Sequence, residues 1–170
     1  MHRKSPLKSP SLALAIGLGL AVIAPLSAQE TEKTVPDADI RAQLTELGYK
    51  YELDEDNDFK LVFEVGDEGR SQIVYVLSAV ETYGNHSVRE IWSPAYESPT
   101  EDFSGPVANR LLEASNSAKL GAWVKQGKNA MFVVKIASNA SKEALDDAID
   151  AAVKLADEME NELTPGQDNL

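Results

Sequence analysis

Phe59-Lys-Leu-Val-Phe-Glu-Val65 and Gln72-Ile-Val-Tyr-Val-Leu-Ser-Ala-Val80 are two β-forming runs separated by the short turn Gly66–Gly69. In the first run apolar and polar residues alternate with the period of two that is typical of a half-buried strand. The second run is apolar on both faces, which favours a place inside a covered sheet. Because so short a turn cannot hold the crossover that parallel strands need, the two strands are predicted to pair antiparallel.

Further strands are predicted on both sides of this pair. Tyr49–Leu53 precedes it, after which the acidic residues 54–58 form a hairpin tip. Val88–Ser93 follows as a fourth strand, and Pro94 is expected to end it because proline cannot donate to a sheet ladder. A last hairpin is predicted from residues 118–125 and 129–137, with Gln126-Gly127-Lys128 as its turn.

Three segments with apolar residues at steps of three and four are predicted to be helices. The first starts at Asp37 and ends at Gly48, where a left-handed cap is needed. The second starts at Pro106, whose missing N–H costs nothing at that position. Its apolar side consists of Val107, Leu111, Leu112 and Ala114. The third starts at Ser141, and its apolar stripe consists of Leu145, Ile149, Ala152, Ala156, Met159 and Leu163.

The predicted order is therefore α-β-β-β-β-α-β-β-α. Strands grouped between helices and joined by tight turns indicate an α+β domain in which helices pack on an antiparallel β-sheet. A single domain is expected over residues 37–163, preceded by a flexible linker at 29–36 and followed by a disordered tail at 164–170. The longest helix is expected to lie on its own sheet, with a dimerising coiled-coil strip as the alternative.

Residues 1–28 have the composition of an export signal. Basic residues precede an apolar run at 11–26, and Ser27-Ala28 offers a cleavage site. The run is shorter than the roughly 20 apolar residues that span a bilayer, and Pro25 interrupts its end. We therefore expect cleavage near Ala28 and a periplasmic or secreted bacterial protein without a stable membrane span; an uncleaved anchor is the alternative.

The charge balance restricts the partners. The chain has 16 Lys plus Arg against 28 Asp plus Glu, and a net charge of −12 that becomes −15 once the three basic residues of the export signal are removed. Such a charge repels nucleic-acid phosphates and anionic lipids and favours basic or cationic partners. The expected partner is a protein or peptide of unknown identity. The chain has no cysteine, which excludes disulfides and lipid attachment at a lipobox.

The sequence contains no recognisable catalytic or metal-binding set. His86 is the only histidine beyond the export signal, which leaves too few ligands for zinc and one turn residue on which to build a triad. The acidic tip 54–58 lacks the glycine and glutamate of an EF-hand loop at the required positions, although a loose Ca²⁺ contact stays open. No cofactor is expected. A carboxylate pair for hydrolysis is an alternative that the sequence cannot locate.

The stretch Val88–Tyr96 mixes charge with aromatic residues. In an extended strand Trp92 shares a face with Glu90, whereas Ile91 shares the opposite face with Arg89, so neither face is cleanly apolar. Such a strand is often an edge or lines a groove. Arginine, tryptophan and tyrosine are typical of interface hot spots, and the alternative is that the tryptophans are core residues. The candidate partner-binding residues are Arg89, Trp92, Tyr96 and Trp123.

Three short segments give the chain a resemblance to the YbjN family, described as bacterial sensory-transduction regulators. They are Arg89-Glu90-Ile91-Trp92-Ser93, Lys119-Leu120-Gly121-Ala122-Trp123 and Ala156-Asp157-Glu158-Met159-Glu160. The resemblance covers residues 37–163. It implies a fold like that of type III secretion chaperones, often dimeric, and no catalytic residues. The export signal departs from the cytoplasmic members, so a chaperone-like or sensory role carries over only as a class of activity.

The preferred expectation is a non-enzymatic periplasmic binding module that contacts a protein or an extended peptide near Trp92. The alternatives are a carboxylate-based hydrolase and a structural envelope protein that acts as a homodimer. The burial of Trp92 distinguishes a core residue from a partner-binding one.

Overall fold

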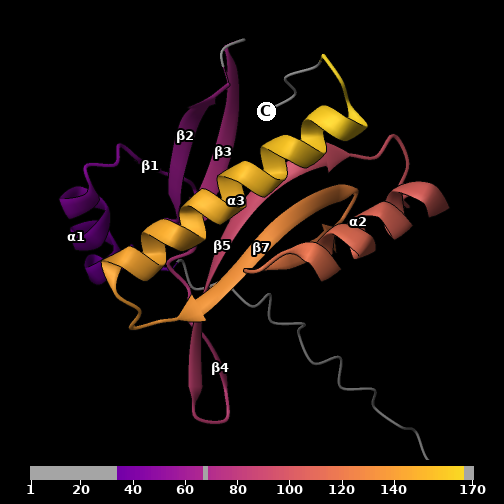
Figure 1. Cartoon of the computed structure of the whole chain (residues 1–170). Coiled ribbons are helices and arrows are strands. Elements are labelled where there is room, and N and C mark those ends of the chain that lie inside the picture. The colour runs from indigo at the N-terminus through magenta and orange to yellow at the C-terminus, as the bar shows by residue number, and fades with distance from the viewer. Residues whose placement is uncertain (1–33, 67–68, 167–170) are drawn as a thin grey trace, which may run out of the picture. The chain divides into compact units, whose positions relative to one another are not determined.

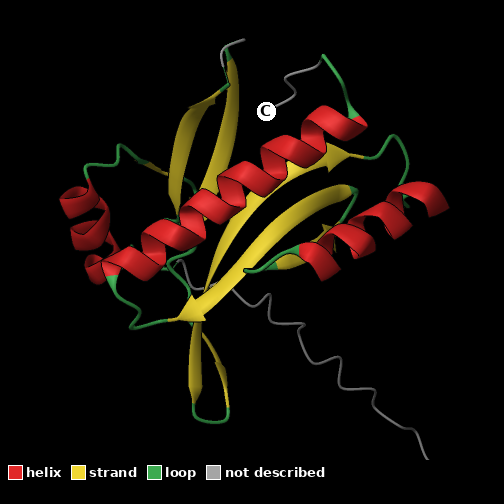
Figure 2. Ribbon diagram, viewed as in Figure 1, coloured by secondary structure: helices red, strands yellow, loops and turns green. Residues whose placement is uncertain are grey.

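A computed structural model describes residues 34–66 and 69–166 of the chain. Within these residues three helices and seven strands form an α+β domain (Figure 2). The helices are α1 (Ala38–Leu47), α2 (Gly105–Ser117) and α3 (Lys142–Leu163). The strands are β1 (Glu52–Leu53), β2 (Phe59–Val65), β3 (Arg70–Val76), β4 (Glu81–Tyr83), β5 (His86–Glu97), β6 (Ala122–Gln126) and β7 (Asn129–Ala137). The predicted fold class is confirmed, with one strand, β4, more than expected.

All the strands belong to one antiparallel sheet. Its order is β1-β2-β3-β5-β7-β6, and β4 pairs with the first residues of β5 outside this path (Figure 1). β5 therefore lies in the middle of the sheet, between β3 and β7. The expectation that the strand carrying Trp92 is an edge strand is wrong, because neighbours pair with it on both sides.

The helices pack on one face of the sheet. In Figure 1, α3 crosses in front of β3 and β5. It also contacts β7, and α2 contacts β6. Alternate strand residues point toward the helices and join them in a single hydrophobic core. The strand residues of this core are Phe59, Leu61, Val74, Val76, Ile91, Ala95, Trp123, Ala130, Phe132 and Val134. We call this side of the sheet the helix face.

The helix ends follow the local chemistry of the sequence. The Ser141 hydroxyl accepts a hydrogen bond from the Ala144 N–H at the start of α3, and Gly48 adopts a φ of 80° at the end of α1. The predicted stripe of α3 is buried or half-buried along its length. One helix prediction is wrong: Leu112 is 67% exposed, and Leu111 is the residue that α2 buries.

β5 does not stop at Pro94 as predicted but continues to Glu97. The register with β7 shifts between Pro94 and Tyr96, which is a bulge, and bulges are where sheets accept proline. The Gln72 side-chain amide also donates to the Pro94 carbonyl at 2.7 Å and to the Ser93 hydroxyl at 2.9 Å. Strand β5 continues past Pro94 because the bulge and the Gln72 side-chain amide replace the regular backbone hydrogen bonds there.

Other strand boundaries also differ from the prediction, and the run Gln72–Val80 is a strand only as far as Val76. The first strand is reduced to Glu52–Leu53, while Tyr49 and Tyr51 before it pack edge-on against Phe63 and Phe59. β6 begins only at Ala122. Gly121 precedes it with a φ of 77°, and a Cβ there would lie 2.5 Å from the Val133 carbonyl oxygen, so only glycine fits.

The segments at the ends of the chain are described in part. The expected export signal and residues 29–33 of the linker lie outside the described residues, as do residues 167–170 of the expected tail. At the start of the described part, the Thr34 carbonyl accepts a hydrogen bond from the Asn57 amide at 2.7 Å. At its end, the Thr164 hydroxyl donates to the Glu160 carbonyl at 2.8 Å. Among residues 34–66 and 69–166, no helix combines the length and the hydropathy of a membrane span.

Candidate functional site

Arg89 is buried on the helix face, with only 2% of its surface exposed. Its Nη1 donates to the carbonyl oxygens of Leu77 and Ser78 at 2.6 and 3.1 Å, and its Nη2 donates to the Asp37 carboxylate at 2.5 Å. Asp37 is the N-cap of α1. The guanidinium therefore ties the start of α1 to the sheet. This burial contradicts the prediction that Arg89 is a surface anchor for a partner.

Tyr96 and Trp123 also belong to the helix face. Trp123 is 9% exposed and stacks edge-on against Phe132 with ring centroids 5.2 Å apart. After the bulge, Tyr96 pairs with the core residue Ala130, and its ring lies 6.0 Å from that of Phe103. Trp123 is therefore a core residue, which agrees with the alternative interpretation of the tryptophans. The bulge separates Tyr96 from Trp92, so the predicted set of four is not one surface.

Trp92 lies on the opposite side of the sheet and is half-buried. It stands directly across from Tyr75 on β3 and from Val133 on β7. Its indole N–H donates to the Glu90 carboxylate at 2.7 Å, and Glu90 also pairs with Lys135 at 2.5 Å. These contacts satisfy the polar atom of the indole and leave its apolar surface available.

Apolar residues of five strands surround Trp92 on this side. Register places Ile73 opposite Val62, and Met131 opposite Val124 and Pro94. None of these residues is part of the helix-covered core, and no helix of the described chain packs on them. Val62 is the most exposed, at 60%. We call this side the open face and define it by Val62, Ile73, Tyr75, Trp92, Val124, Met131 and Val133.

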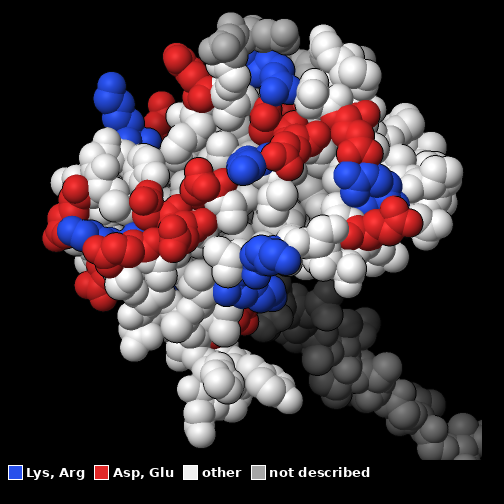
Figure 3. Space-filling view, in the orientation of Figure 1, with Lys and Arg blue, Asp and Glu red and all other residues white. Residues whose placement is uncertain are grey.

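The charges on the open face are few, and they include Glu52 of β1, which stands opposite Lys60. Lys60 and Glu64 occupy its alternate positions on β2, and the Glu90–Lys135 pair occupies those of β5 and β7. On the other side of the domain, acidic side chains spread across α3 (Figure 3). The acidity of the chain therefore belongs mainly to the helix side, and the open face offers apolar and aromatic contacts.

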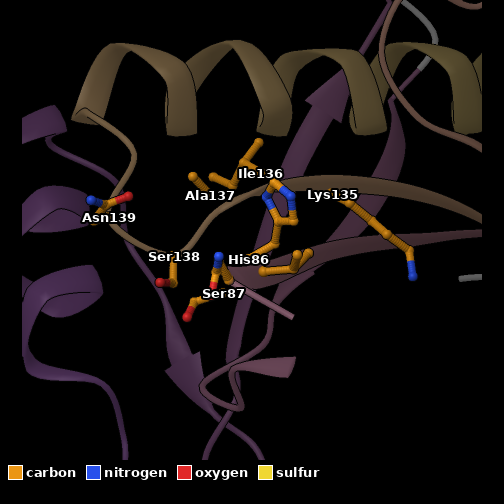
Figure 4. A pocket seen from close by; sticks show the side chains of 9 residues that line it. His86, Ser87, Lys135, Ile136, Ala137, Ser138 and Asn139 are labelled. Carbon is orange, nitrogen blue, oxygen red and sulfur yellow. The ribbon is translucent and has the colours of Figure 1, made fainter. Parts of the chain in front are cut away.

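A groove lies where the β4–β5 hairpin meets the end of β7 (Figure 4). It has a volume of about 590 Å³ and is lined by residues 85–88 and 135–139, which include His86 and Lys135. None of these residues is acidic. His86 is exposed on the hairpin. Ser87 and Ser138 contribute hydroxyl groups to the groove, and Asn85 and Asn139 contribute side-chain amides.

The structure also locates the carboxylates that a hydrolase would need. One cavity of about 400 Å³ is lined by Glu97 and the buried Glu160. The Lys128 ammonium lies 2.8 Å from Glu97 and neutralises it. The part of the chain that is described contains no group of three or more His, Asp or Glu side chains that could hold a metal ion.

Sequence reasoning found Trp92 but missed its neighbours. Tyr75 and Val62 belong to runs that were assigned to strands, and only the pairing register brings them beside Trp92. The available signal was the two-sided apolarity of residues 72–80, which indicates burial on both faces. The structure covers one of those faces with helices.

The comparisons with known proteins add no relative to this picture. No family model matches the sequence, and no curated protein matches it. The resemblance to the YbjN family stays a prediction that rests on the three segments given above.

Proposed function

We propose that the protein is a non-enzymatic, exported binding module that holds a protein partner on the open face of its sheet. The site is the apolar surface around Trp92, Tyr75 and Val62. The proposal carries over the chaperone-like or sensory class of activity only as a class. Export itself is proposed from the composition of residues 1–28.

The observation that supports the proposal is that β3 and β7 are apolar on both faces, whereas the helices of the described chain cover only one face. β7 carries five successive buried apolar residues, Ala130 to Val134, and β3 is apolar at Ile73, Val74 and Tyr75. Strands with this pattern are normally covered on both faces. The helices of the described chain cover one. Met131 and Val133 are already buried, so a partner on the open face would mainly remove from water the apolar surface of Val62, Tyr75 and Trp92.

The chemistry of the face specifies the kind of partner. Aromatic and aliphatic side chains in the centre, with paired charges at the rim, are the composition of a protein interface core. Because the lysines Lys60 and Lys135 nearly offset the glutamates Glu52, Glu64 and Glu90, the face does not select for a strongly basic partner. We expect a partner that presents an uncharged apolar surface.

Site-specific photo-crosslinking tests this proposal without disturbing the fold. A photoreactive phenylalanine analogue at Val62 lies on the open face, and the same analogue at Leu112 lies on the helix side with similar exposure, 60% against 67%. In cells that produce the protein, position 62 is expected to give a discrete adduct with another protein, and position 112 is not. Equal labelling at both positions would contradict the proposal.

A second measurement tests whether the aromatic residues contribute most of the binding energy. Once the adduct is identified, the affinity of the purified partner is compared for the wild type and for Trp92→Ala/Tyr75→Ala. Aromatic hot spots contribute about 2 kcal/mol or more, so the double variant should bind at least about 30-fold more weakly. A variant with unchanged circular dichroism and unchanged affinity would show that the open face is not the binding site.

A further inference from the structure

The β4–β5 hairpin projects from the domain as a separate arm (Figure 1). We define the arm as Ala79–Val88. Every residue from 79 to 87 is exposed, and Tyr83 and Val80 are 84% and 41% exposed. Glu81 is its one charged residue, in a chain of net charge −12. In Figure 3 the arm is correspondingly almost free of charged side chains.

The geometry of the hairpin leaves one residue of β4 whose backbone N–H and C=O have no strand partner within the described residues. Tyr83 and His86 flank the two-residue loop Gly84-Asn85, and Gly84 has a φ of 59°, as hairpin turns with glycine at the first loop position require. The pair that flanks such a loop exchanges both backbone hydrogen bonds, and bonded pairs alternate along the ladder. Thr82 therefore directs its N–H and C=O away from β5.

This edge lacks the protection that the outer edge of the sheet has. At β6, the Trp123 N–H donates to the Ser115 hydroxyl of α2 at 2.9 Å, so a helix covers that edge. On β4 no strand or helix of the described chain covers the edge, and the arm contains no lysine, arginine or proline. Edges without such residues are templates for pairing with another strand.

We propose that the occupant of this edge is the β4 edge of a second copy, paired antiparallel about a two-fold axis that passes through Thr82. In this register the two Thr82 residues exchange their free N–H and C=O groups, and Thr–Thr pairs are favourable across strands. Glu81 of each copy then stands opposite Tyr83 of the other. Val80 stands opposite Gly84, which has no side chain to obstruct it.

The alternative register that also matches the free groups is centred on Glu81. It would place the two Glu81 carboxylates directly opposite each other, and like charges at opposed positions destabilise a sheet. The Thr82 register keeps them apart and pairs all three residues of β4. The sequence Glu81-Thr82-Tyr83 is therefore complementary to its own copy.

The charge distribution also favours a second copy at this place. Two chains of net charge −12 repel each other over most of their surfaces. The arm extends beyond the acidic helix side and carries little charge, so two copies can meet there at the lowest electrostatic cost. The contact is smaller than the roughly 1,200 Å² of a stable interface, which predicts a weak, reversible dimer.

Pairing through β4 would also fix how two open faces are presented. Tyr83 and Glu81 pair with His86 and Val88, which share a strand face with Trp92. A two-fold axis between antiparallel strands is perpendicular to the sheet, so both open faces would point to the same side and could hold two sites of one partner. The dimer itself does not depend on the proposed function.

Sedimentation velocity of the purified chain between about 5 µM and about 500 µM tests the pairing. The wild type is expected to shift from monomer toward dimer as concentration rises. Tyr83→Glu places a glutamate opposite Glu81 twice in each dimer and should weaken association about tenfold. Glu81→Lys/Tyr83→Glu restores opposite charges and should recover or exceed the wild-type association. Leu112→Glu, on the helix side, is the matched control and should have no effect.

Each result decides the proposal. Rescue by the charge exchange supports the Thr82 register, because only residues that face each other across the axis can compensate. A chain that stays monomeric at every concentration overturns the proposal. So does a dimer that Tyr83→Glu leaves unchanged, since such a dimer would use another surface. All these positions are exposed, so the variants should keep the wild-type circular dichroism spectrum.

Discussion

The two faces of the sheet use the same kinds of residue for opposite purposes. Arg89 and Trp92 are neighbours on β5, but the alternation of a strand sends Arg89 to the helix face and Trp92 to the open face. Arg89 is 2% exposed, and its guanidinium donates hydrogen bonds to Leu77, Ser78 and Asp37 of the same domain. Trp92 is half-buried, and one carboxylate satisfies its single polar atom. Position in the pleat, and not residue type, decides which of them is available to a partner.

The comparison extends to the packing. On the helix face, α3 places Leu145 and Ile149 over the strands, and both are fully buried. On the open face no helix of the described chain covers the strands, and exposure is uneven: Val62 keeps 60% of its surface exposed, whereas Met131 and Val133 keep 7% and 4%. Removing a side chain from the first face leaves a cavity, whereas removing one from the second mainly exposes what lies beside it.

The largest expected difference is between Phe132→Ala and Trp92→Ala. Phe132 is fully buried on the helix face, and its truncation should lower the free energy of unfolding by about 3–5 kcal/mol. Trp92→Ala removes a half-buried ring that no helix covers and should cost about 1–2 kcal/mol. Urea denaturation of both variants measures the two losses.

The control for this pair is Leu112→Ala, on an exposed position of α2, which should stay within about 0.5 kcal/mol of the wild type. Equal losses from Phe132→Ala and Trp92→Ala would mean that the open face is part of the folded core. The face could then not be a free binding surface.

A smaller difference is expected between two paired cations, Arg89, whose partner is the N-cap of α1, and Lys135, whose partner Glu90 lies on the neighbouring strand. Arg89→Met keeps the apolar stem but removes the donor to Asp37 Oδ2 and to two carbonyl groups, while Asp37 Oδ1 still accepts from the Asp39 and Ile40 N–H groups. The loss should be about 2–3 kcal/mol, less than for a fully buried pair because Asp37 is 23% exposed. Lys135→Met breaks a pair whose lysine is 61% exposed and should cost less than about 0.5 kcal/mol.

Thermal or urea unfolding of the two variants, with helix content followed at 222 nm, measures this contrast. If Arg89→Met were as stable as the wild type, the guanidinium would not hold α1 on the sheet. The assignment of Arg89 to the fold in place of a binding site would then lose its support.

Periodicity was sufficient to predict the helices and most strands because those signals are local. The apolar stripe of α3 and the alternation of β2 are properties of neighbouring residues. The bulge at Pro94 was not predictable in this way, since it depends on Gln72, which is 22 residues away in the chain. β4 was missed because its three residues, Glu81–Tyr83, are too few to show the period of two that identifies a strand.

The candidate site shows the same limit more strongly. The sequence placed Trp92 and Arg89 on opposite strand faces, which the structure bears out. It could not say which face the helices cover, and it could not pair Arg89 with Asp37, 52 residues earlier. Tyr75 joined the site only through register. Residues that meet through long-range pairing leave no periodic signal in a single sequence.

The smallest expected effects come from two carboxylates near Arg89 whose pKa values shift in opposite directions. Partial burial raises the pKa of Asp37, but the hydrogen bond from the Ile40 N–H and the charge and hydrogen bonds of Arg89 outweigh it, so the pKa lies below its ordinary value of 3.8. Burial raises the pKa of Asp58 above that value, despite a hydrogen bond from the Ser78 N–H.

The signs of the stability changes follow from linkage. A lowered folded-state pKa means that Asp37 stabilises the protein above pH 3.8, and this contribution is lost as the pH falls through the folded value. Asp37→Asn should therefore cost about 1 kcal/mol at neutral pH and progressively less below pH 3.8. A raised pKa has the reverse effect: the Asp58 carboxyl progressively destabilises the folded protein as the pH rises from 3.8 through its folded-state pKa.

Asp58→Asn should accordingly be neutral to slightly stabilising at pH 7, by no more than about 0.5 kcal/mol after solvent screening. Its gain should disappear as the pH falls below 3.8, where the wild-type carboxyl is also neutral. Urea midpoints of both variants between about pH 3 and pH 7 measure the two profiles. Because asparagine can still accept the local backbone hydrogen bonds, the variants isolate charge from shape. Profiles of the same sign would mean that Arg89 does not distinguish Asp37 from Asp58, and the ion pair would then not be what fixes α1 to the helix face.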